Sequence, residues 1–154
     1  MFTELDWAYI AGFFDGDGSV SISRLRDATK VRKVGYQAQV LLAQNPPCPL
    51  LSELLHEFGG KIYKNGRACN SLMWRCPARN HIKFLEKLLP YLRLKKDAAE
   101  IAIEYQRRVD KNPNSRPLTD AEWGARTALY ERMQDTFDKR GVSMHARGRR
   151  RRGS

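Results

Sequence analysis

The sequence Trp7-Ala-Tyr-Ile-Ala-Gly-Phe-Phe-Asp-Gly-Asp-Gly-Ser19 joins an apolar stretch to an acidic, glycine-rich end. Before it, Thr3 and Asp6 have the spacing of a capping box, which predicts a helix that begins there and continues to about Phe14. After it, Ser19-Val-Ser-Ile-Ser23 alternates polar and apolar residues, which is typical of a half-buried strand. The stretch therefore predicts a helix followed directly by a strand.

Small residues recur every fourth position in the predicted helix, at Ala8, Gly12 and Gly16. This spacing places them on one face, where the lack of bulk allows another helix backbone to approach closely. One interpretation is that they fit a tight place inside a single domain. The other is that they form the interface with a second copy of the chain.

Two carboxylates, Asp15 and Asp17, close the motif. A calcium-binding loop does not explain them, because Val20 stands where such a loop needs glycine and Arg26 where it needs glutamate. One aspartate alone binds Mg²⁺ weakly, and metal-assisted hydrolysis of phosphodiesters uses several oxygen ligands. If two copies packed through the small-residue face, two Asp17 carboxylates would converge.

Two hairpins are predicted in the following sequence. The first joins Ser19–Ser23 to Gln37–Leu41, and the second joins Gly60–Lys64 to Ser71–Arg75 through the turn signal Asn65-Gly66. By alternation, one face of the strands is apolar and belongs to the core: Val20, Ile22, Ala38, Val40, Leu42, Ile62, Leu72 and Trp74. The opposite face is polar and basic: Ser21, Ser23, Gln37, Gln39, Lys61, Tyr63 and Arg75.

Four more helices are expected, at Pro49–Phe58, His81–Leu89, Lys95–Val109 and from Thr119 to about Thr136. The order of elements predicts an α+β fold, with antiparallel strands and helices packed on one face of the sheet. We expect one domain over residues 1–138, followed by a basic and flexible arm over residues 139–154.

The formal net charge is +11 for 154 residues, but the positive charge is unevenly placed. Residues 139–154 hold seven Lys or Arg and no acidic residue, and residues 60–83 hold six with no acidic residue. Residues 19–44 hold five against one aspartate. An ordinary solvated sheet face mixes both signs of charge, so the acid-poor hairpins favour a polyanionic partner. The arm alone would give only nonspecific attraction.

Other classes of protein are disfavoured. No apolar run approaches the length of about 18 residues that a membrane span needs, and the acidic start is unlike a secretory signal, so we expect an intracellular protein without a membrane partner. Organelle and prokaryotic cytoplasm are not distinguished. Cys48, Cys69 and Cys76 lack the spacing of a disulfide framework or a zinc site. No small-molecule substrate is expected.

The stretch Ile10–Gly18 resembles the signature of the LAGLIDADG homing endonucleases, and its single copy resembles the homodimeric branch of that family. Phe58-Gly-Gly-Lys-Ile-Tyr63 and Leu89-Pro-Tyr-Leu-Arg-Leu-Lys95 resemble later markers of the family. The resemblance covers about residues 5–110. It implies an αββαββα fold whose antiparallel sheet forms a saddle on DNA, with the helices on the other face.

The resemblance also implies catalytic roles. Asp17, with the carbonyl of Gly16, would bind Mg²⁺, for which Mn²⁺ or Ca²⁺ could substitute in binding. Gln44 would order solvent near the attacking water, and Lys95 would polarise that water or stabilise charge near the phosphate, although Gln44 and Lys95 could also be an ordinary strand-end amide and helix-start residue. Some relatives carry an arginine shortly after the glutamine, where this chain has Asn45-Pro-Pro-Cys-Pro49.

The activity implied is intron homing: a homodimer that cleaves double-stranded DNA at a long pseudo-palindromic site. The alternatives are a maturase-like or regulatory relative that binds nucleic acid without cutting it, and a nonspecific binder driven by the arm. The alternation near Arg24 and Arg26 is unclear, and we expect only one of them to face DNA. The expected DNA-binding residues are Ser21, Ser23, Arg24, Arg26, Lys30, Arg32, Gln37, Gln39, Lys61, Tyr63, Asn65, Arg67, Ser71 and Arg75.

Overall fold

The computed structural model describes residues 1–64, 66, 70–113 and 117–140. The helices are α1 (Glu4–Asp17), α2 (Pro49–Phe58), the short 3-10 helix η1 (Ala78–Asn80), α3 (His81–Leu88), α4 (Lys96–Lys111) and α5 (Asp120–Lys139). The strands are β1 (Gly18–Arg26), β2 (Val34–Gln44), β3 (Lys61–Lys64) and β4 (Leu72–Arg75). No helix in these ranges is both long and apolar enough to cross a membrane.

The four strands form one antiparallel sheet in the order β1-β2-β4-β3. Val20 pairs with Val40, and Ser21 with Gln39, so buried and open positions alternate in register along the first hairpin. The predicted α+β arrangement and the two faces of the sheet are confirmed.

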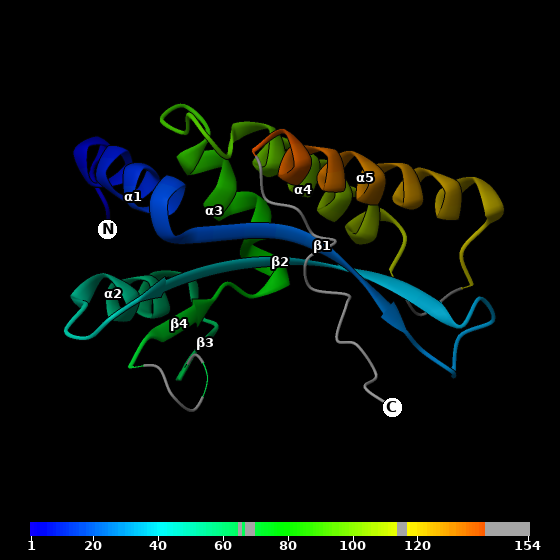
Figure 1. The fold of residues 1–154 in the computed structure, drawn as a ribbon, viewed down its shortest axis with the longest axis horizontal. Helices are drawn as coiled ribbons and strands as arrows, with labels where there is room; N and C mark the ends of the chain where they lie inside the picture. The colour runs from blue at the N-terminus through cyan, green and yellow to red at the C-terminus, as the bar shows by residue number, and fades with distance from the viewer. Residues whose placement is uncertain (65, 67–69, 114–116, 141–154) are drawn as a thin grey trace, which may run out of the picture.

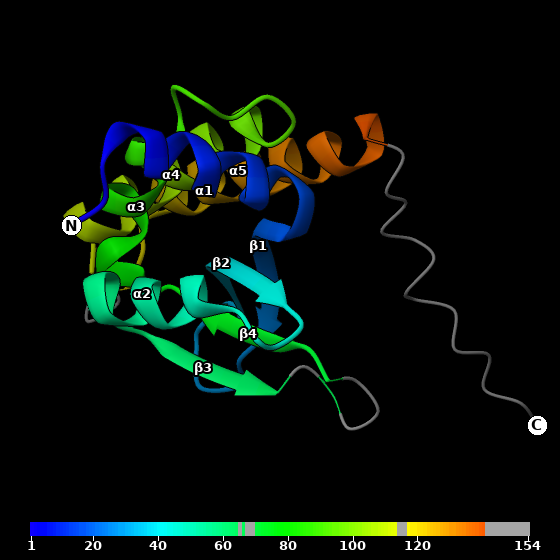
Figure 2. The ribbon, with the colours of Figure 1, turned by 90° about the vertical axis from the view of Figure 1, so that its left-hand side faces the viewer.

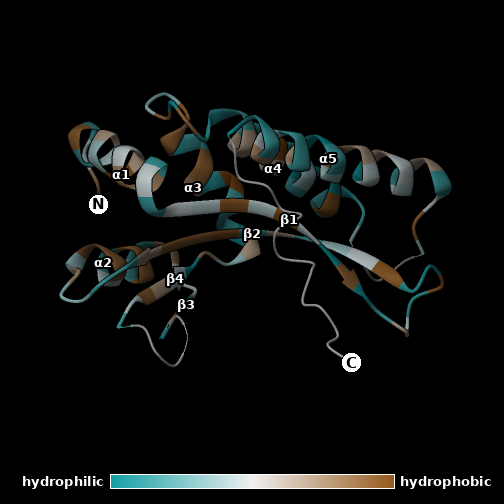
Figure 3. Ribbon diagram, in the orientation of Figure 1, coloured by the Kyte–Doolittle hydropathy of each residue, from teal (hydrophilic) through white to brown (hydrophobic). Residues whose placement is uncertain are grey.

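Helices cover one face of this sheet, as Figures 1 and 2 show for α1, α3, α4 and α5. The middle of β2 is coloured hydrophobic in Figure 3, where it lies beneath the helical layer. Aromatic side chains fill the core there, and the rings of Trp74 and Phe84 meet edge to face at 5.1 Å between centroids. Among the described residues, no helix lies over the other face of the sheet in either view.

Helix α1 is longer than predicted, because it continues through the acidic end of the motif to Asp17. The capping box of Thr3 and Asp6 starts it as expected. At the other end, the carbonyl of Phe14 accepts hydrogen bonds from the backbone N–H of Gly18 and from Nζ of Lys95. These donors satisfy the last turn of the helix, which a sequence pattern alone does not reveal.

The first hairpin is also longer than the predicted strands, and α5 runs along its distal half (Figure 1). Tyr36 of β2 stacks between Trp123 and Tyr130 of α5, with ring centroids 5.0 and 5.2 Å away. Its hydroxyl lies 3.0 Å from Oγ1 of Thr127. Helix α5 ends at Lys139 rather than near Thr136, and residues 141–154 of the expected arm lie outside the described residues.

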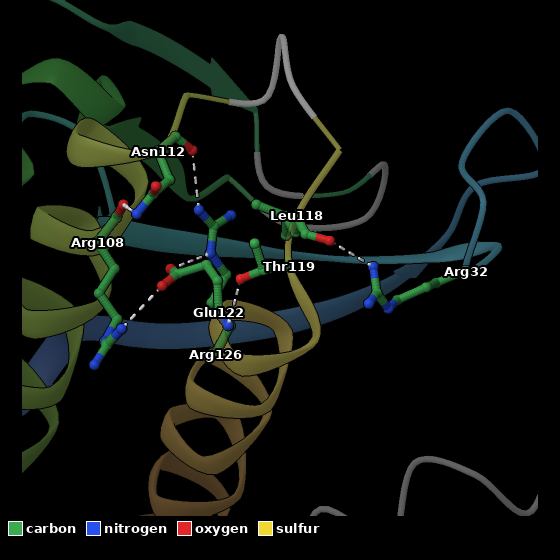
Figure 4. Close-up of polar contacts among 7 residues, drawn as sticks. All are labelled: Arg32, Arg108, Asn112, Leu118, Thr119, Glu122 and Arg126. Atoms are coloured by element: carbon green, nitrogen blue, oxygen red, sulfur yellow. Dashed lines mark hydrogen bonds and ion pairs between the residues drawn. The ribbon is translucent and has the colours of Figure 1, made fainter.

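An ion cluster built around the buried Arg126 joins α4 to α5 (Figure 4). The carboxylate of Glu122 lies between two guanidinium groups, accepting from Nε of Arg126 at 3.0 Å and from Nη1 of Arg108 at 2.9 Å. Arg126 is only 3% exposed, and its Nη2 also donates to the carbonyl of Asn112 at 3.1 Å. The cluster fixes α5 on α4, and α5 in turn supports the hairpin.

Candidate active site

Asp17 is the last residue of α1 and its side chain is exposed. Gln44, the last residue of β2, donates from Nε2 to Oδ2 of Asp17 at 3.1 Å. The oxygen of the same amide accepts from the backbone N–H of Asn45 at 2.8 Å, which fixes the orientation of the amide group. Residues 27 positions apart therefore meet where the helix enters the sheet.

The other acid of the motif, Asp15, has a different task. Its carboxylate accepts three backbone N–H groups from the loop before α4, those of Arg93 at 2.8 Å, Leu94 at 3.3 Å and Lys95 at 3.0 Å. A carboxylate used in this way is tied to the protein. Its place in the structure is to hold the loop before α4 against the end of α1.

Lys95 lies at the same end of α1. Its ammonium donates to the carbonyls of Phe14 at 3.0 Å and Asp15 at 2.5 Å. Burial lowers the pKa of Lys95 below its usual 10.5, and the positive charge of Arg140 adds to this, whereas Asp15 and Asp17 oppose it. Lys95 thus places positive charge at the carbonyl end of the helix, beside Asp17.

The small residues of α1 face outward. Ala8, Gly12 and Gly16 are exposed, and a Cβ atom added to either glycine would have no atom within 4 Å in the described chain. The interpretation that these residues fit a tight place within one domain is therefore wrong. Leu5 and Tyr9, which are 83% and 63% exposed, add apolar surface to the same helix.

The open face of the sheet carries half of the fourteen expected DNA-binding residues. The register pairs Ser21 with Gln39 and Ser23 with Gln37, directly across the first hairpin. Lys61 pairs with Arg75 in the second hairpin, and Leu41 of β2 pairs with Arg75 from the other side, so the two hairpins form a continuous face. Tyr63 is on this face as well, with its hydroxyl 3.1 Å from the sulfur of Met73.

Arg24 and Arg26 lie on the other side of β1. The register pairs Arg24 with Tyr36, which faces α5, and residues two apart in a regular strand share a face. The expectation that only one of these arginines points to the open face is therefore wrong. The open face instead carries Leu25, which lies between the two arginines and is 44% exposed. Leu25 was not among the residues expected there from the sequence, although continuing the alternation of Ser21 and Ser23 by two residues places it on this face.

Other expected residues are held elsewhere. Lys30 lies 3.7 Å from a carboxylate oxygen of Asp27 in the hairpin turn. Arg32 turns back to α5, where it pairs with Asp120, donates to the carbonyl of Leu118 at 3.1 Å (Figure 4) and lies over the ring of Trp123.

The last three expected residues lie between β3 and β4 in the sequence. Ser71 is buried, with 9% of its surface exposed. Asn65 and Arg67 lie outside the described residues.

The oxygen atoms at the end of α1 suit a hard divalent cation. The carboxylate of Asp17 is exposed, and the adjacent residue Gly16 has open space around its α-carbon. Carboxylate and main-chain carbonyl oxygens are the ligands that Mg²⁺ and Ca²⁺ prefer. Within the described part of one chain, no three His, Cys, Asp or Glu side chains are grouped closely enough to hold a metal ion.

The profile of the LAGLIDADG endonuclease family matches residues 10–105, which include the motif, the whole sheet and most of α4. This match covers more than half of the sequence, and the chain belongs to the LAGLIDADG endonuclease family. It is thus a member of a family of DNA-binding nucleases, with one copy of the motif. The comparison with curated proteins found no match.

Solved structures share the fold. The chain is similar to the homing endonuclease I-CvuI bound to its target in the presence of calcium, with 21% identity and a TM-score of 0.71 over 88% of this chain and 83% of that one. It is similar to the archaeal intron-encoded homing endonuclease I-Vdi141I bound to DNA, with 19% identity and a TM-score of 0.73 over 86% and 84%. For DNA-bound I-SmaMI, the values are 18% and 0.66, over 90% of this chain and 50% of that one.

Proposed function

We propose that this protein is a site-specific homing endonuclease that cleaves double-stranded DNA with Mg²⁺ and acts as a homodimer on a long pseudo-palindromic site. The observation that carries the proposal is the structure of α1. One face of this helix is small, apolar and exposed, and the same helix ends in the exposed carboxylate of Asp17.

The dimer forms through α1 of each copy. Ala8, Gly12 and Gly16 allow the two helix backbones to approach closely, and Leu5 and Tyr9 supply apolar area to bury. Because both helices end at Asp17, the two carboxylates are brought together. The correspondence of this chain to half of I-SmaMI supports a functional unit with two such folds.

At each active site, the carboxylate of Asp17 and the carbonyl of Gly16 would hold the metal. A bound Mg²⁺ stabilises negative charge on phosphate oxygens and makes water a better nucleophile. Gln44 holds the Asp17 carboxylate in place through its amide. Lys95 supplies fixed positive charge near the phosphate being cleaved.

The open face of the sheet contacts the DNA. The amides of Gln37 and Gln39 and the hydroxyls of Ser21 and Ser23 are suited to hydrogen bonding with base edges in the major groove. Two copies would read two half-sites related by the dimer axis, which is why the target is expected to be pseudo-palindromic.

Selection from a randomised duplex library tests this proposal. With Mg²⁺, the wild-type chain is expected to enrich cleaved duplexes with two related half-sites, and Asp17→Asn is expected to bind the same sequences without cutting them. Ca²⁺ and Mn²⁺ in place of Mg²⁺ would define the metal requirement. A wild-type chain that binds specific duplexes but never nicks them with any of these ions would contradict the nuclease proposal.

A further inference from the structure

A hollow of about 380 Å³ opens beside the second hairpin, at the corner where β3 and β4 meet η1. Gln37 of β2 lines it on the side of the open sheet face, and three cations line it elsewhere: Lys61 of β3, Arg75 of β4 and Arg79 of η1. Among the described residues that line the hollow, none is acidic. Arg79 was not among the residues that the sequence pointed to.

Two glycines and two side-chain hydrogen bonds shape the corner at this hollow. Gly59 and Gly60 follow α2 with φ of 71° and 99°, and a Cβ atom on Gly60 would lie 2.1 Å from the carbonyl oxygen of Arg75. Nε1 of Trp74 donates to the carbonyl of Gly59 at 2.9 Å. Nδ2 of Asn80 donates to the carbonyl of Phe58 at 2.7 Å. The close approach of these segments requires glycine.

The same glycines make room for a guanidinium group. A Cβ atom on Gly59 would lie 3.3 Å from Nη2 of Arg79, so this side chain lies against the glycine backbone while remaining exposed. Every ion pair between described residues involves other side chains, which leaves Lys61, Arg75 and Arg79 without a carboxylate within 4 Å there. Three uncompensated cations around one hollow favour an anion.

We propose that Arg79, together with Lys61 and Arg75, binds one backbone phosphate of DNA beside the base-reading face. This inference rests on the proposed function. DNA is the expected source of the anion because Gln37, Lys61 and Arg75 connect the hollow with the open sheet face. The planar fork of Arg79 is suited to two phosphate oxygens. Such a contact fixes the register of the duplex and adds affinity without reading sequence.

The test measures binding of the selected duplex as a function of salt, in full-length chains that also carry Asp17→Asn so that the DNA stays intact. Arg79→Gln is expected to reduce the slope of log K against log salt by about 0.9, the value for one phosphate contact on B-DNA. Arg107→Gln is the matched control, because Arg107 is an exposed arginine of α4 paired with Glu86. Arg79→Lys keeps the charge and is expected to retain the slope.

The preferred bases should be the same for Arg79→Gln and its parent. Equal salt slopes for Arg79→Gln and Arg107→Gln would overturn the phosphate site, and so would a change in selected sequence. Equal slopes or a changed sequence preference would leave the proposed endonuclease function standing. A parent chain that selects no duplex at all would instead overturn the proposed function, and this inference with it.

Discussion

Asp15 and Lys95 hold each other in two ways: the backbone N–H of Lys95 donates to Oδ1 of Asp15, and the ammonium of Lys95 donates to the main-chain carbonyl of Asp15. The carboxylate of Asp15 thus binds the loop before α4, and the ammonium of Lys95 in that loop binds the C-terminal end of α1. This reciprocal contact places Lys95 beside Asp17 before any DNA is bound.

Asp15→Asn is expected to loosen this contact. Oδ2 of Asp15 accepts two N–H groups, from Arg93 and Leu94, and an amide NH₂ in that place would face donors. We expect the free energy of unfolding to fall by about 1.5–3 kcal/mol and the cleavage rate to fall with it. Denaturant titration measures the first effect, and Asp138→Asn, at an exposed position of α5, is the control. Equal stability of the two variants would contradict the docking role.

Gly12→Glu is expected to separate the proposed dimer without unfolding the chain. A side chain at Gly12 meets no atom within 4 Å in the described chain, but it would charge and crowd the small-residue face. Sedimentation at micromolar concentration should show a monomer, and cleavage should be lost.

The matched control for that variant is Gly124→Glu, because Gly124 lies in α5 with equally open space. It should sediment and cut like the wild type. If Gly12→Glu remained dimeric and active, α1 would not be the interface.

Glu122→Gln is expected to cost about 3–5 kcal/mol of unfolding free energy, the usual effect of removing one partner from a buried ion pair. The reason is that Arg126 is 3% exposed and would keep its charge without a carboxylate beside it. Glu104→Gln breaks a pair whose side chains are 56% and 50% exposed, and should cost no more than about 1 kcal/mol. Thermal or urea unfolding compares the two variants. Similar losses of unfolding free energy would show that burial of Arg126 does not make its ion pair more important than an exposed pair.

His81 predicts a loss of stability in acid. Burial lowers its pKa below 6.5, and this outweighs the hydrogen bond to the carbonyl of Cys76. Between the lowered pKa and 6.5 the unfolded chain binds a proton that the folded chain does not, so stability is present above 6.5 and is lost as the pH falls. Urea unfolding between about pH 7.5 and 5.5 should show this slope, and His81→Gln should flatten it. His56→Gln, at an exposed position, is the control, and an equal flattening in both variants would contradict the role of burial at His81.

Short-range patterns predicted much of this molecule. Alternation assigned the two faces around Val20 and Ser21 because the strand period is local, and the capping box located the start of α1. Spacing showed that Gly12 and Gly16 share a face. It did not show that this face is open, because coverage depends on where other helices pack.

What the sequence could not predict depends on contacts between distant residues. Helix α1 continues to Asp17 because Lys95, some 80 positions later, satisfies its carbonyls. Arg32 is a residue type that often contacts DNA, yet it pairs with Asp120, which is 88 positions away. The strand order, with β4 between β2 and β3, likewise depends on which edges meet in space.

Because Arg32 binds the start of α5, it limits which segments could be exchanged between family members in a chimeric protein. Residues 27–33 look like a separate loop in the sequence, but Arg32 contacts Leu118, Asp120 and Trp123 at the start of α5. A chimera that received only the loop would leave those groups without their partner. The transferable module is therefore discontinuous, a hairpin tip together with the first turn of the last helix, and grafting should move both.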